Sequence, residues 1–460
     1  MVDPSESDPD VPASGGEILY GEQTRLAIAN FRISGLRFPR ALVRALGLIK
    51  ACAARVNRDL GILPGELSQA IEESAMTVAE GMQDDQFPVD VFQTGSGTST
   101  NMNANEVVAA LAARRLGRAV HPNDDVNLGQ SSNDVIPTAI HVGAALELVR
   151  CMEALESLRE SILARASEHA AVVKTGRTHL MDAVPMTLGQ ELSGWAAQVE
   201  TGLARLRDVK ERLLALAQGG TAVGTGLNAH PGFAHRFAAT MAERTGLAFR
   251  PAPNTFAAIG SQDTAVELSG QLRATAITLL KIATDLRWMN SGPVSGLGEI
   301  HLPELQPGSS IMPGKVNPVI PEAVGMACVQ VIGLDTAVAL AAQDNRFQLA
   351  TMLPLIAYNL LQQLALLTSA TRSLEKQAIM CFDANVQDLA ERAGRNAMLA
   401  TALTPRIGYD LAARIAKSAL EQGRALIDVA REMSGLPEGE LLKLVDPERM
   451  ARPHDHALKP

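Results

Sequence analysis

The stretch of sequence that decides the fold is Gly308-Ser309-Ser310-Ile311-Met312-Pro313-Gly314-Lys315-Val316-Asn317-Pro318. Its glycines and prolines disfavour both a helix and a central strand, so the sequence predicts a shaped loop. The loop carries the positive charge of Lys315 and hydrogen-bond donors from two serines and an asparagine. Such a set of groups suits a small anion.

A long helical pattern follows this loop, from Val319 to about Ala342. Asn317 suits the N-cap of that helix and Pro318 its first position. The positive end of the helix would then face the same anion. An ordinary Gly/Ser/Pro connection is the alternative, and it is disfavoured because a lysine and a capping asparagine stand beside the hydroxyls.

Length and composition restrict the class of protein. A chain of 460 residues exceeds one hydrophobic core, so two or three structural units are expected. Of these residues 47% are hydrophobic and only 3% aromatic, so alanine and leucine supply the apolar mass and favour helices over sheets. The formal charge of −9 disfavours nucleic acid as a partner.

The cysteines and the apolar runs indicate the compartment. Cys52, Cys151, Cys328 and Cys381 form no C-x-x-C pair, and we expect buried thiols in a reducing environment. No secretory signal opens the sequence, and no uninterrupted apolar run is expected to span a bilayer. The sequence therefore predicts a cytoplasmic protein without membrane association.

Long helical patterns dominate the middle of the chain. They cover about Val135–His169, Leu188–Leu216, Ser261–Met289, Pro318–Ala342 and Pro354–Gln377. Each would span roughly 35–50 Å at 1.5 Å per residue. Several leave little polar face, so they must be covered on most sides, in part by other subunits.

Two polar motifs precede these helices. In Gln93–Glu106, glycines allow close approach to a ligand, Ser96 and Thr98 can donate to a carboxylate, and a helix is expected to begin near Asn101 to Asn105. Ser131, Ser132 and Asn133 would offer donors at another helix N-terminus, although such clusters often only cap helices.

Two further segments contain histidines. Lys174–Pro185 lies between long helices and includes Thr178 and His179, and a lone loop histidine is more often a plain hydrogen-bonding residue. Arg118–Asp125 includes His121 and reads equally well as a solvated turn. His454 and His456 lack a carboxylate or cysteine scaffold, which disfavours a metal role.

The Gly308–Pro318 string resembles the Gly-Ser-Ser-x-Met-Pro-x-Lys-x-Asn-Pro signature of the fumarase/aspartase superfamily. Gly176-Arg177-Thr178-His179, followed by Asp182-Ala183, resembles a second signature, and the resemblance extends from about Ile18 to Met450. Histidine at position 179 and serine at position 96 match class II fumarases, whereas aspartases typically carry glutamine in place of the histidine.

The resemblance implies an all-α fold. A long central bundle, with five helices per chain and twenty in a homotetramer, would be flanked by smaller N- and C-terminal helical domains. The expected divisions are a disordered tail (1–16), an N-terminal domain (17–130), a central bundle domain (131–382) and a small C-terminal domain (383–460).

The resemblance also implies the reaction and the residues that perform it. A class II fumarate hydratase of the tricarboxylic acid cycle reversibly hydrates fumarate to L-malate, by anti elimination and addition of water through a carboxylate-stabilised carbanion. Ser309 would be the base, Lys315 and Asn317 would hold the carboxylate, and His179 paired with Glu322 would act on the water side. The implied substrate-binding residues are Ser96, Gly97, Thr98, Ser131, Ser132, Asn133, Thr178, Ser310, Lys315, Val316 and Asn317.

Further implications concern assembly and accessory sites. Each active site would combine residues of three chains: Ser96, Thr98 and Ser131–Asn133 from one, Thr178 and His179 from a second, and Ser309–Asn317 from a third. A second, non-catalytic anion site would use Arg118, His121, Pro122, Asn123 and Asp124. No metal and no cofactor are expected.

Two alternatives stay open at this point. One is an aspartate ammonia-lyase or another fumarate-releasing lyase of the superfamily, against which His179 and Ser96 speak. The other is a non-enzymatic relative, which should have lost Ser309, His179 or Lys315. A departure at Asn345–Ala350, where class II fumarases usually read Gly-Asn-Phe-Glu-Leu-Asn, leaves the substrate preference open.

Overall fold

The computed structural model describes residues 17–452, so the expected tail at 1–16 and His454 and His456 lie outside the described residues. The helices are α1 (Glu22–Asn30), α2 (Arg40–Asp59), α3 (Gly65–Ala79), α4 (Thr98–Leu116), α5 (Ser132–Glu168), α6 (Leu188–Leu213), α7 (Phe233–Thr245), α8 (Thr255–Gly260), α9 (Asp263–Met289), α10 (Val319–Ala342), α11 (Leu353–Leu374), α12 (Val386–Arg395), α13 (Thr404–Ile407), α14 (Tyr409–Gln422), α15 (Leu426–Met433), α16 (Glu438–Leu444) and α17 (Pro447–Met450). Short 3₁₀ or π segments are η1 (Asp84–Gln86), η2 (Pro122–Val126), η3 (Glu375–Ile379) and η4 (Ala397–Leu403).

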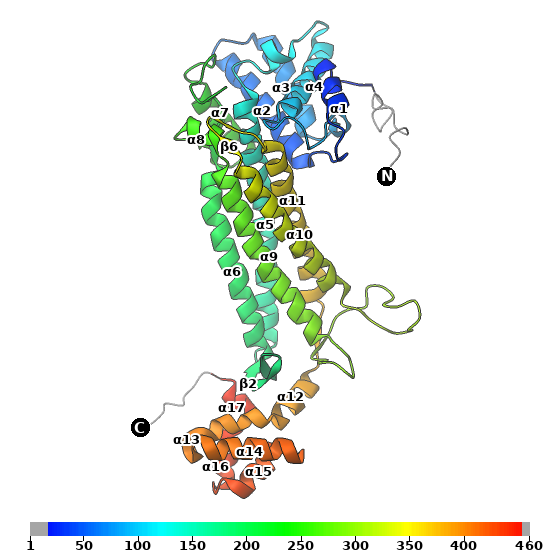
Figure 1. Ribbon diagram of the computed structural model, residues 1–460, viewed down its shortest axis with the longest axis vertical. Coiled ribbons are helices and arrows are strands. Elements are labelled where there is room, and N and C mark those ends of the chain that lie inside the picture. Colours follow the sequence, from blue (N-terminus) through cyan, green and yellow to red (C-terminus); the bar gives the residue numbers. More distant parts are fainter. Residues whose placement is uncertain (1–16, 453–460) are drawn as a thin grey trace. The chain divides into compact units, whose positions relative to one another are not determined.

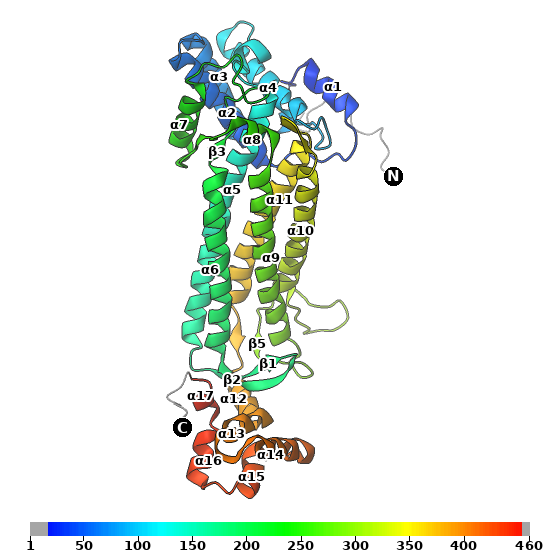
Figure 2. The ribbon, with the colours of Figure 1, turned by 60° about the vertical axis from the view of Figure 1, so that its left-hand side comes forward.

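The expected all-α class is confirmed, since helices account for most of the described chain. The five long helices α5, α6, α9, α10 and α11 begin and end within a few residues of the expected bounds. In each of the two compact units into which the chain divides, the stretches of these helices lie side by side (Figures 1 and 2). Apolar residues at helical spacing fill the spaces between them.

Unit 1 contains the described residues up to Glu153, together with Gly202–Ile277 and Ala327–Ser369. Its N-terminal part packs α2 against α3 so closely that a Cβ on Gly47 would lie 2.6 Å from the backbone nitrogen of Ala79. The buried carboxylate of Glu106 on α4 accepts hydrogen bonds from backbone N–H groups at the start of α1, including Gly21 at 2.9 Å and Thr24 at 3.1 Å. A single carboxylate therefore satisfies several of the free backbone donors at the start of α1.

Unit 2 contains Ala154–Thr201, Thr278–Met326 and the described residues from Ala370 onward. Its C-terminal helices, α12 to α17, surround a small core of their own, which includes Leu399, Leu403, Ile415, Leu426 and Leu441. Near the end of α5, the His169 ring stacks on Phe382 with centroids 5.6 Å apart.

The strands are short and pair in twos. They are β1 (Val173–Thr178) with β2 (Met181–Thr187), β3 (Ala215–Leu216) with β4 (Arg250–Pro251), β5 (Ile300–His301) with β8 (Asp383–Ala384), and β6 (Asn345–Arg346) with β7 (Leu349–Ala350). All pairs are antiparallel except β3 with β4.

Two expectations about apolar segments and thiols were wrong. Three helices are long and apolar enough to cross a membrane by length and composition: Ser132–Glu168, Val319–Ala342 and Leu353–Ile379. In the first and third, 67% of the apolar window is buried inside the chain, so that apolar surface serves core packing. Cys52, Cys151 and Cys328 are buried as expected, but Cys381 is exposed because it follows the last turn of η3.

Candidate functional site

The Ser309 loop is held in shape by its own polar groups. The Ser309 hydroxyl oxygen accepts hydrogen bonds from the backbone N–H groups of Ile311 at 3.2 Å and Met312 at 3.1 Å. Across the loop, the Asn317 amide donates to the Gly308 carbonyl at 2.7 Å. Gly308 is required there, because a Cβ would lie 2.0 Å from the carbonyl oxygen of Lys315. Most of the loop is solvent-exposed, and its two ends lie close together.

The expectation that Asn317 caps the following helix was wrong. Helix α10 begins at Val319, and its first helical hydrogen bond runs from the Glu322 N–H to the Pro318 carbonyl at 3.1 Å. Pro318 is therefore the cap residue, and the Asn317 side chain closes the loop instead. Glu322 lies in the first turn of α10, as expected.

His179 lies at the tip of a β-hairpin and not in an irregular loop. The hairpin pairs Thr178 with Met181, so His179 and Leu180 form a two-residue turn with φ values of 57° and 61°. Two positive φ angles define a type I′ turn, which favours glycine or asparagine. Holding a histidine in this conformation costs about 1 kcal/mol, and such strain is found most often where a side chain must be presented. Within the described chain, no hydrogen bond joins His179 to Glu322.

The first polar motif forms a tight turn in unit 1. The hydroxyl oxygens of Ser96 and Thr98 are 2.8 Å apart. Gly97 between them has a φ of 73°, so α4 begins at Thr98 and not near Asn101 to Asn105 as expected. Gly95 is in close contact with its surroundings, since a Cβ there would lie 1.7 Å from the carbonyl oxygen of Thr351.

The second polar motif forms the N-terminus of α5. The Ser131 hydroxyl accepts from the Asn133 N–H at 3.3 Å, and the Asp134 carboxylate accepts from the Ser131 N–H at 2.9 Å. This reciprocal pair is similar to a capping box, with aspartate in the acidic position and the Ser131 hydroxyl bonded to the N–H two residues on instead of three. The Asn101 amide of α4 donates to the Ser132 hydroxyl at 3.0 Å, so the two polar motifs meet in unit 1.

Two buried charged groups lie behind this motif, and sequence reasoning missed both. Lys50 on α2 is fully buried, and its ammonium group donates to Asn127 at 2.8 Å and Gln130 at 3.2 Å. Burial lowers the pKa of Lys50 to about 7, while the Asp134 carboxylate acts in the opposite direction. The only local signal was a lysine within the apolar run Leu46–Ala54.

Asp134 connects the α5 N-terminus to a glycine-rich segment. Its second carboxylate oxygen accepts from the backbone N–H groups of Gly219 at 3.0 Å and Thr221 at 2.9 Å. Burial raises the pKa of Asp134 to about 6, against the opposing effect of these donors and of Lys50. The Asn133 amide donates to the Ala222 carbonyl at 2.8 Å, which fixes the same segment.

The expected second anion site is an exposed turn. The His121 Nδ1 accepts from the Asp124 N–H at 3.0 Å, and the His121 N–H donates to Asp125 at 2.7 Å. The His121 Nδ1 also lies 3.2 Å from an Asp124 carboxylate oxygen. Arg118 and Asn123 are exposed on the same segment.

The segment that departs from the usual fumarase pattern is the β6–β7 hairpin. Its tip residue Phe347 has a φ of 54° and is 94% exposed. The chain continues to Thr351, which packs on Gly95, and the Leu353 N–H donates to the Gly95 carbonyl at 3.0 Å. The departure therefore lies next to the first polar motif.

The expected site residues fall into two sets. Unit 1 contains Ser96, Gly97, Thr98 and Ser131–Asn133, and unit 2 contains Thr178, His179, Ser309, Ser310, Lys315–Asn317 and Glu322. Among the described residues, no group of three or more His, Cys, Asp or Glu side chains is arranged to hold a metal ion.

Comparison with known proteins identifies the family. A lyase family matches residues 16–333, and a family described as the fumarase C C-terminus matches residues 399–452. The "Fumarate hydratase class II 2" of Pseudomonas aeruginosa is 56% identical over 441 residues, 96% of each chain. The "Fumarate hydratase class II" of Thermus thermophilus is 48% identical over 95% of this chain and 96% of that one. The chain belongs to the class II fumarate hydratase family.

Solved structures agree with membership of this family. The class II fumarase of Schistosoma mansoni superposes with a TM-score of 0.93 at 38% identity, covering 95% of this chain and 97% of that one. The fumarate lyase:delta crystallin of Brucella melitensis, in a structure bound to cobalt, gives 0.90 at 44% identity, covering 95% and 96%. The fumarase C C-terminus match coincides with the small core of unit 2.

Proposed function

We propose that this chain is a hydro-lyase that interconverts fumarate and L-malate, as its class II fumarate hydratase relatives are named to do. The observation that carries the proposal is the environment of the Ser309 hydroxyl. Its oxygen accepts hydrogen bonds from two backbone N–H groups in the loop that also carries Lys315. A neutral serine is too weak a base for a carbon acid, and N–H donors aimed at its oxygen stabilise the alkoxide that the reaction needs.

The reaction proceeds in two steps. The Ser309 alkoxide takes a proton from the carbon beside the carboxylate held by Lys315 and Asn317, and that carboxylate accepts the electron pair as a dianionic intermediate. The pair then forms the double bond while the hydroxyl leaves the neighbouring carbon with a proton from His179, oriented by Glu322. The products are fumarate and water, and the reverse sequence hydrates fumarate.

The active site is composite and the enzyme is a homotetramer in this proposal. Support comes from α10, where only 28% of the most apolar window is buried within one chain. Met326, Val329 and Leu340 on this helix are 69%, 59% and 62% exposed. Apolar surface of this extent on a long helix is stable in water when other copies of the chain cover it. The twenty-helix bundle would cover it and bring residues of both units, from different chains, to one site.

Three smaller parts of the proposal complete it. The exposed turn at Arg118–Asp124 binds a second anion, supported by the exposed side chains of Arg118 and His121. The chain is organised as an N-terminal domain, a central bundle and a small C-terminal domain, and the separate core around Leu403 supports the last of these. The enzyme is cytoplasmic, in keeping with four free thiols.

The test is to supply the purified protein with L-malate, L-aspartate or argininosuccinate in the presence of a chelator. Fumarate is followed by its ultraviolet absorbance and ammonia by a coupled assay. We expect rapid fumarate release from malate and little turnover of aspartate. A His179→Asn protein prepared in parallel controls for contaminating host enzyme. Faster ammonia release from aspartate than fumarate release from malate would refute the proposal and favour the ammonia-lyase alternative.

A further inference from the structure

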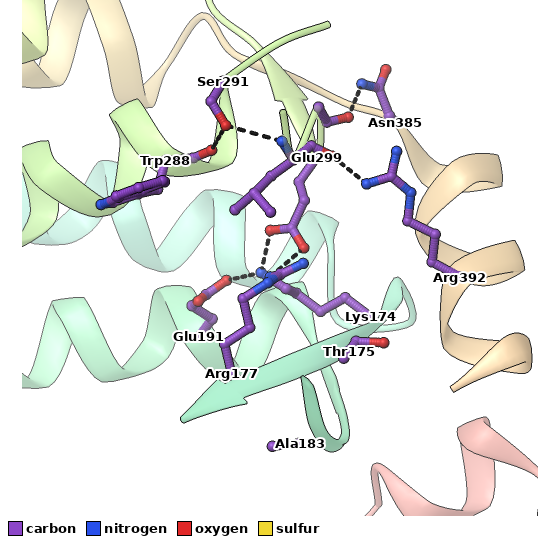
Figure 3. A network of polar contacts seen from close by, with 12 residues as sticks. Lys174, Thr175, Arg177, Ala183, Glu191, Trp288, Ser291, Glu299, Asn385 and Arg392 are labelled. Atoms are coloured by element: carbon purple, nitrogen blue, oxygen red, sulfur yellow. Dashed lines mark hydrogen bonds and ion pairs between the residues drawn. The ribbon is translucent and has the colours of Figure 1, made fainter. Parts of the chain in front are cut away.

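Unit 2 contains a buried network of charges centred on Glu299 (Figure 3). One carboxylate oxygen of Glu299 accepts from the Lys174 ammonium at 2.6 Å, and the other accepts from the Arg177 guanidinium at 2.6 Å. Lys174 also donates to Glu191 on α6 at 2.5 Å. The Lys174 and Glu299 side chains are each 1% exposed. Two cations face two carboxylates, so the network is neutral as a whole.

Stability alone does not explain such a network. Removing Lys174 and Glu299 from water costs several kcal/mol for each ion, and well-packed apolar residues of similar volume stabilise a fold as well or better. What ion pairs add is direction, because each hydrogen bond fixes the position of one group against another. The relevant question is therefore which two segments the network holds together.

One segment is the hairpin that presents His179. Lys174 and Arg177 both belong to β1, and a bulge between Thr175 and Arg177 directs these side chains toward Glu299. Beyond Arg177, the chain from Thr178 to Asp182 is exposed. Arg177 is thus the last side chain that anchors the strand before the strained turn.

The other segment comprises residues 299–302, which precede the Ser309 loop and which we call its stem. The Glu299 N–H donates to the Met289 carbonyl at 2.8 Å, and its carbonyl accepts from the Asn385 N–H at 2.9 Å. Ile300 pairs with β8, and the Leu302 N–H donates to Asn290 at 2.8 Å. These backbone bonds fix the stem without using the Glu299 carboxylate, which is left to hold the hairpin.

We propose that Glu299 is a positioning residue, which holds the His179 hairpin in its working orientation against the stem of the Ser309 loop through Lys174 and Arg177. This inference rests on the proposed function, because it assumes that His179, whose hairpin Glu299 positions, takes part in the reaction. The Glu299 carboxylate is buried and bonds to Lys174 and Arg177, so its effect is transmitted through β1.

The first test is Glu299→Gln, which keeps the shape of the side chain and removes its charge. The loop stem keeps its backbone bonds, so Lys315 still binds the ground-state carboxylate and the KM for malate changes less than about threefold. A displacement of a catalytic group by about 1 Å lowers rates on the order of 100-fold, so kcat is expected to fall about 10- to 100-fold. An unchanged kcat overturns the inference.

A double variant separates positioning from stability. Lys174→Met combined with Glu299→Gln leaves one cation, Arg177, and one carboxylate, Glu191, so the charges of the network balance again and thermal stability returns toward that of the wild type. If the network positions the hairpin, kcat stays low in this stable protein. Recovery of kcat together with stability would assign the network a purely structural role and overturn the inference.

Amide hydrogen exchange supplies a measurement that needs no activity. In Glu299→Gln the amides of residues 176–182 should exchange at least tenfold faster than in the wild type. The matched control is Glu375→Gln, a buried carboxylate of the same unit that accepts from Ser157 at 2.6 Å and Ser161 at 2.9 Å without touching the hairpin. Unchanged exchange in Glu299→Gln, or the same increase in the control, overturns the inference. A wild type inactive on malate refutes the proposed function, and the exchange result still decides the positioning of the hairpin.

Discussion

Replacement of the buried lysine behind the α5 N-terminus should change how stability depends on pH. Lys50 is fully buried, and its ammonium group contacts only two amide oxygens, those of Asn127 and Gln130, in its hydrogen bonds. Burial lowers its pKa from 10.5 to about 7. In Lys50→Met, a side chain of similar length occupies the same apolar surroundings and carries no proton to lose.

The sign and size of the effect follow from proton linkage. Between pH 7 and 10.5 the unfolded chain holds a proton on Lys50 that the folded chain has released, so stability rises with pH across this window. The full shift is 10.5 − 7 = 3.5 pKa units, worth about 5 kcal/mol at 1.36 kcal/mol per unit. Between pH 7 and pH 9 it amounts to about 2 kcal/mol. Asp134 acts in a separate and lower range. Because its pKa is raised from 3.8 to about 6, its contribution to the stability of the fold falls as pH rises from about 4 to 6.

The measurement is the unfolding free energy from urea titrations at pH 7, 8 and 9, at one subunit concentration, because the stability of an oligomer depends on it. Between pH 7 and pH 9, the unfolding free energy of the wild type should rise by about 2 kcal/mol more than that of Lys50→Met. Lys417→Met, at a side chain 77% exposed, is the matched control and should run parallel to the wild type. Equal pH slopes for the wild type and Lys50→Met would show that Lys50 has an ordinary pKa and refute the reasoning.

The remaining predictions concern the site and its assembly. Ser309→Ala should lower kcat by at least 100-fold with unchanged circular dichroism, whereas Lys315→Ala should also raise KM, because the carboxylate it binds is charged in both ground and transition states. Equal mixtures of Ser309→Ala and His179→Asn chains, unfolded and refolded together, should recover roughly a quarter of the sites, and lasting inactivity in proven hybrids would exclude a composite site. Gly95→Ala should destabilise by more than about 2 kcal/mol, since its Cβ would lie 1.7 Å from a carbonyl oxygen. Gly270→Ala on α9, where nothing lies within 4 Å, is its control and should be neutral or stabilising in the same thermal melts.

The long helices were predictable because their signal is periodic and repeated over many residues. The hairpin at His179 was not predictable. A type I′ turn is normally recognised in a sequence by glycine or asparagine, whereas here histidine and leucine adopt the positive φ angles. The predicted start of α10 was wrong because two structural roles compete for the Asn317 side chain. Asn317 is a good capping residue, but its amide is used by the Gly308 carbonyl across the loop, a contact that no local pattern indicates.

The residues that support the site escaped sequence reasoning for a further physical reason. Motifs identify groups that face a ligand, because ligand chemistry demands particular residue types in a short string. The groups behind them are selected by distant partners: Lys50 meets Asn127, and Glu299 meets Lys174, contacts that span 77 and 125 positions. By hydrophobic pattern alone such buried positions should be apolar, and apolar residues that replaced a whole buried ion pair would fill the space without loss of stability. A charge retained at such a position fixes the orientation of its hydrogen-bonded partners instead. Asp134 is an example, since its one carboxylate caps α5 and also binds the backbone N–H of Thr221. Buried, paired charges next to a motif are therefore where we expect further positioning residues in this fold.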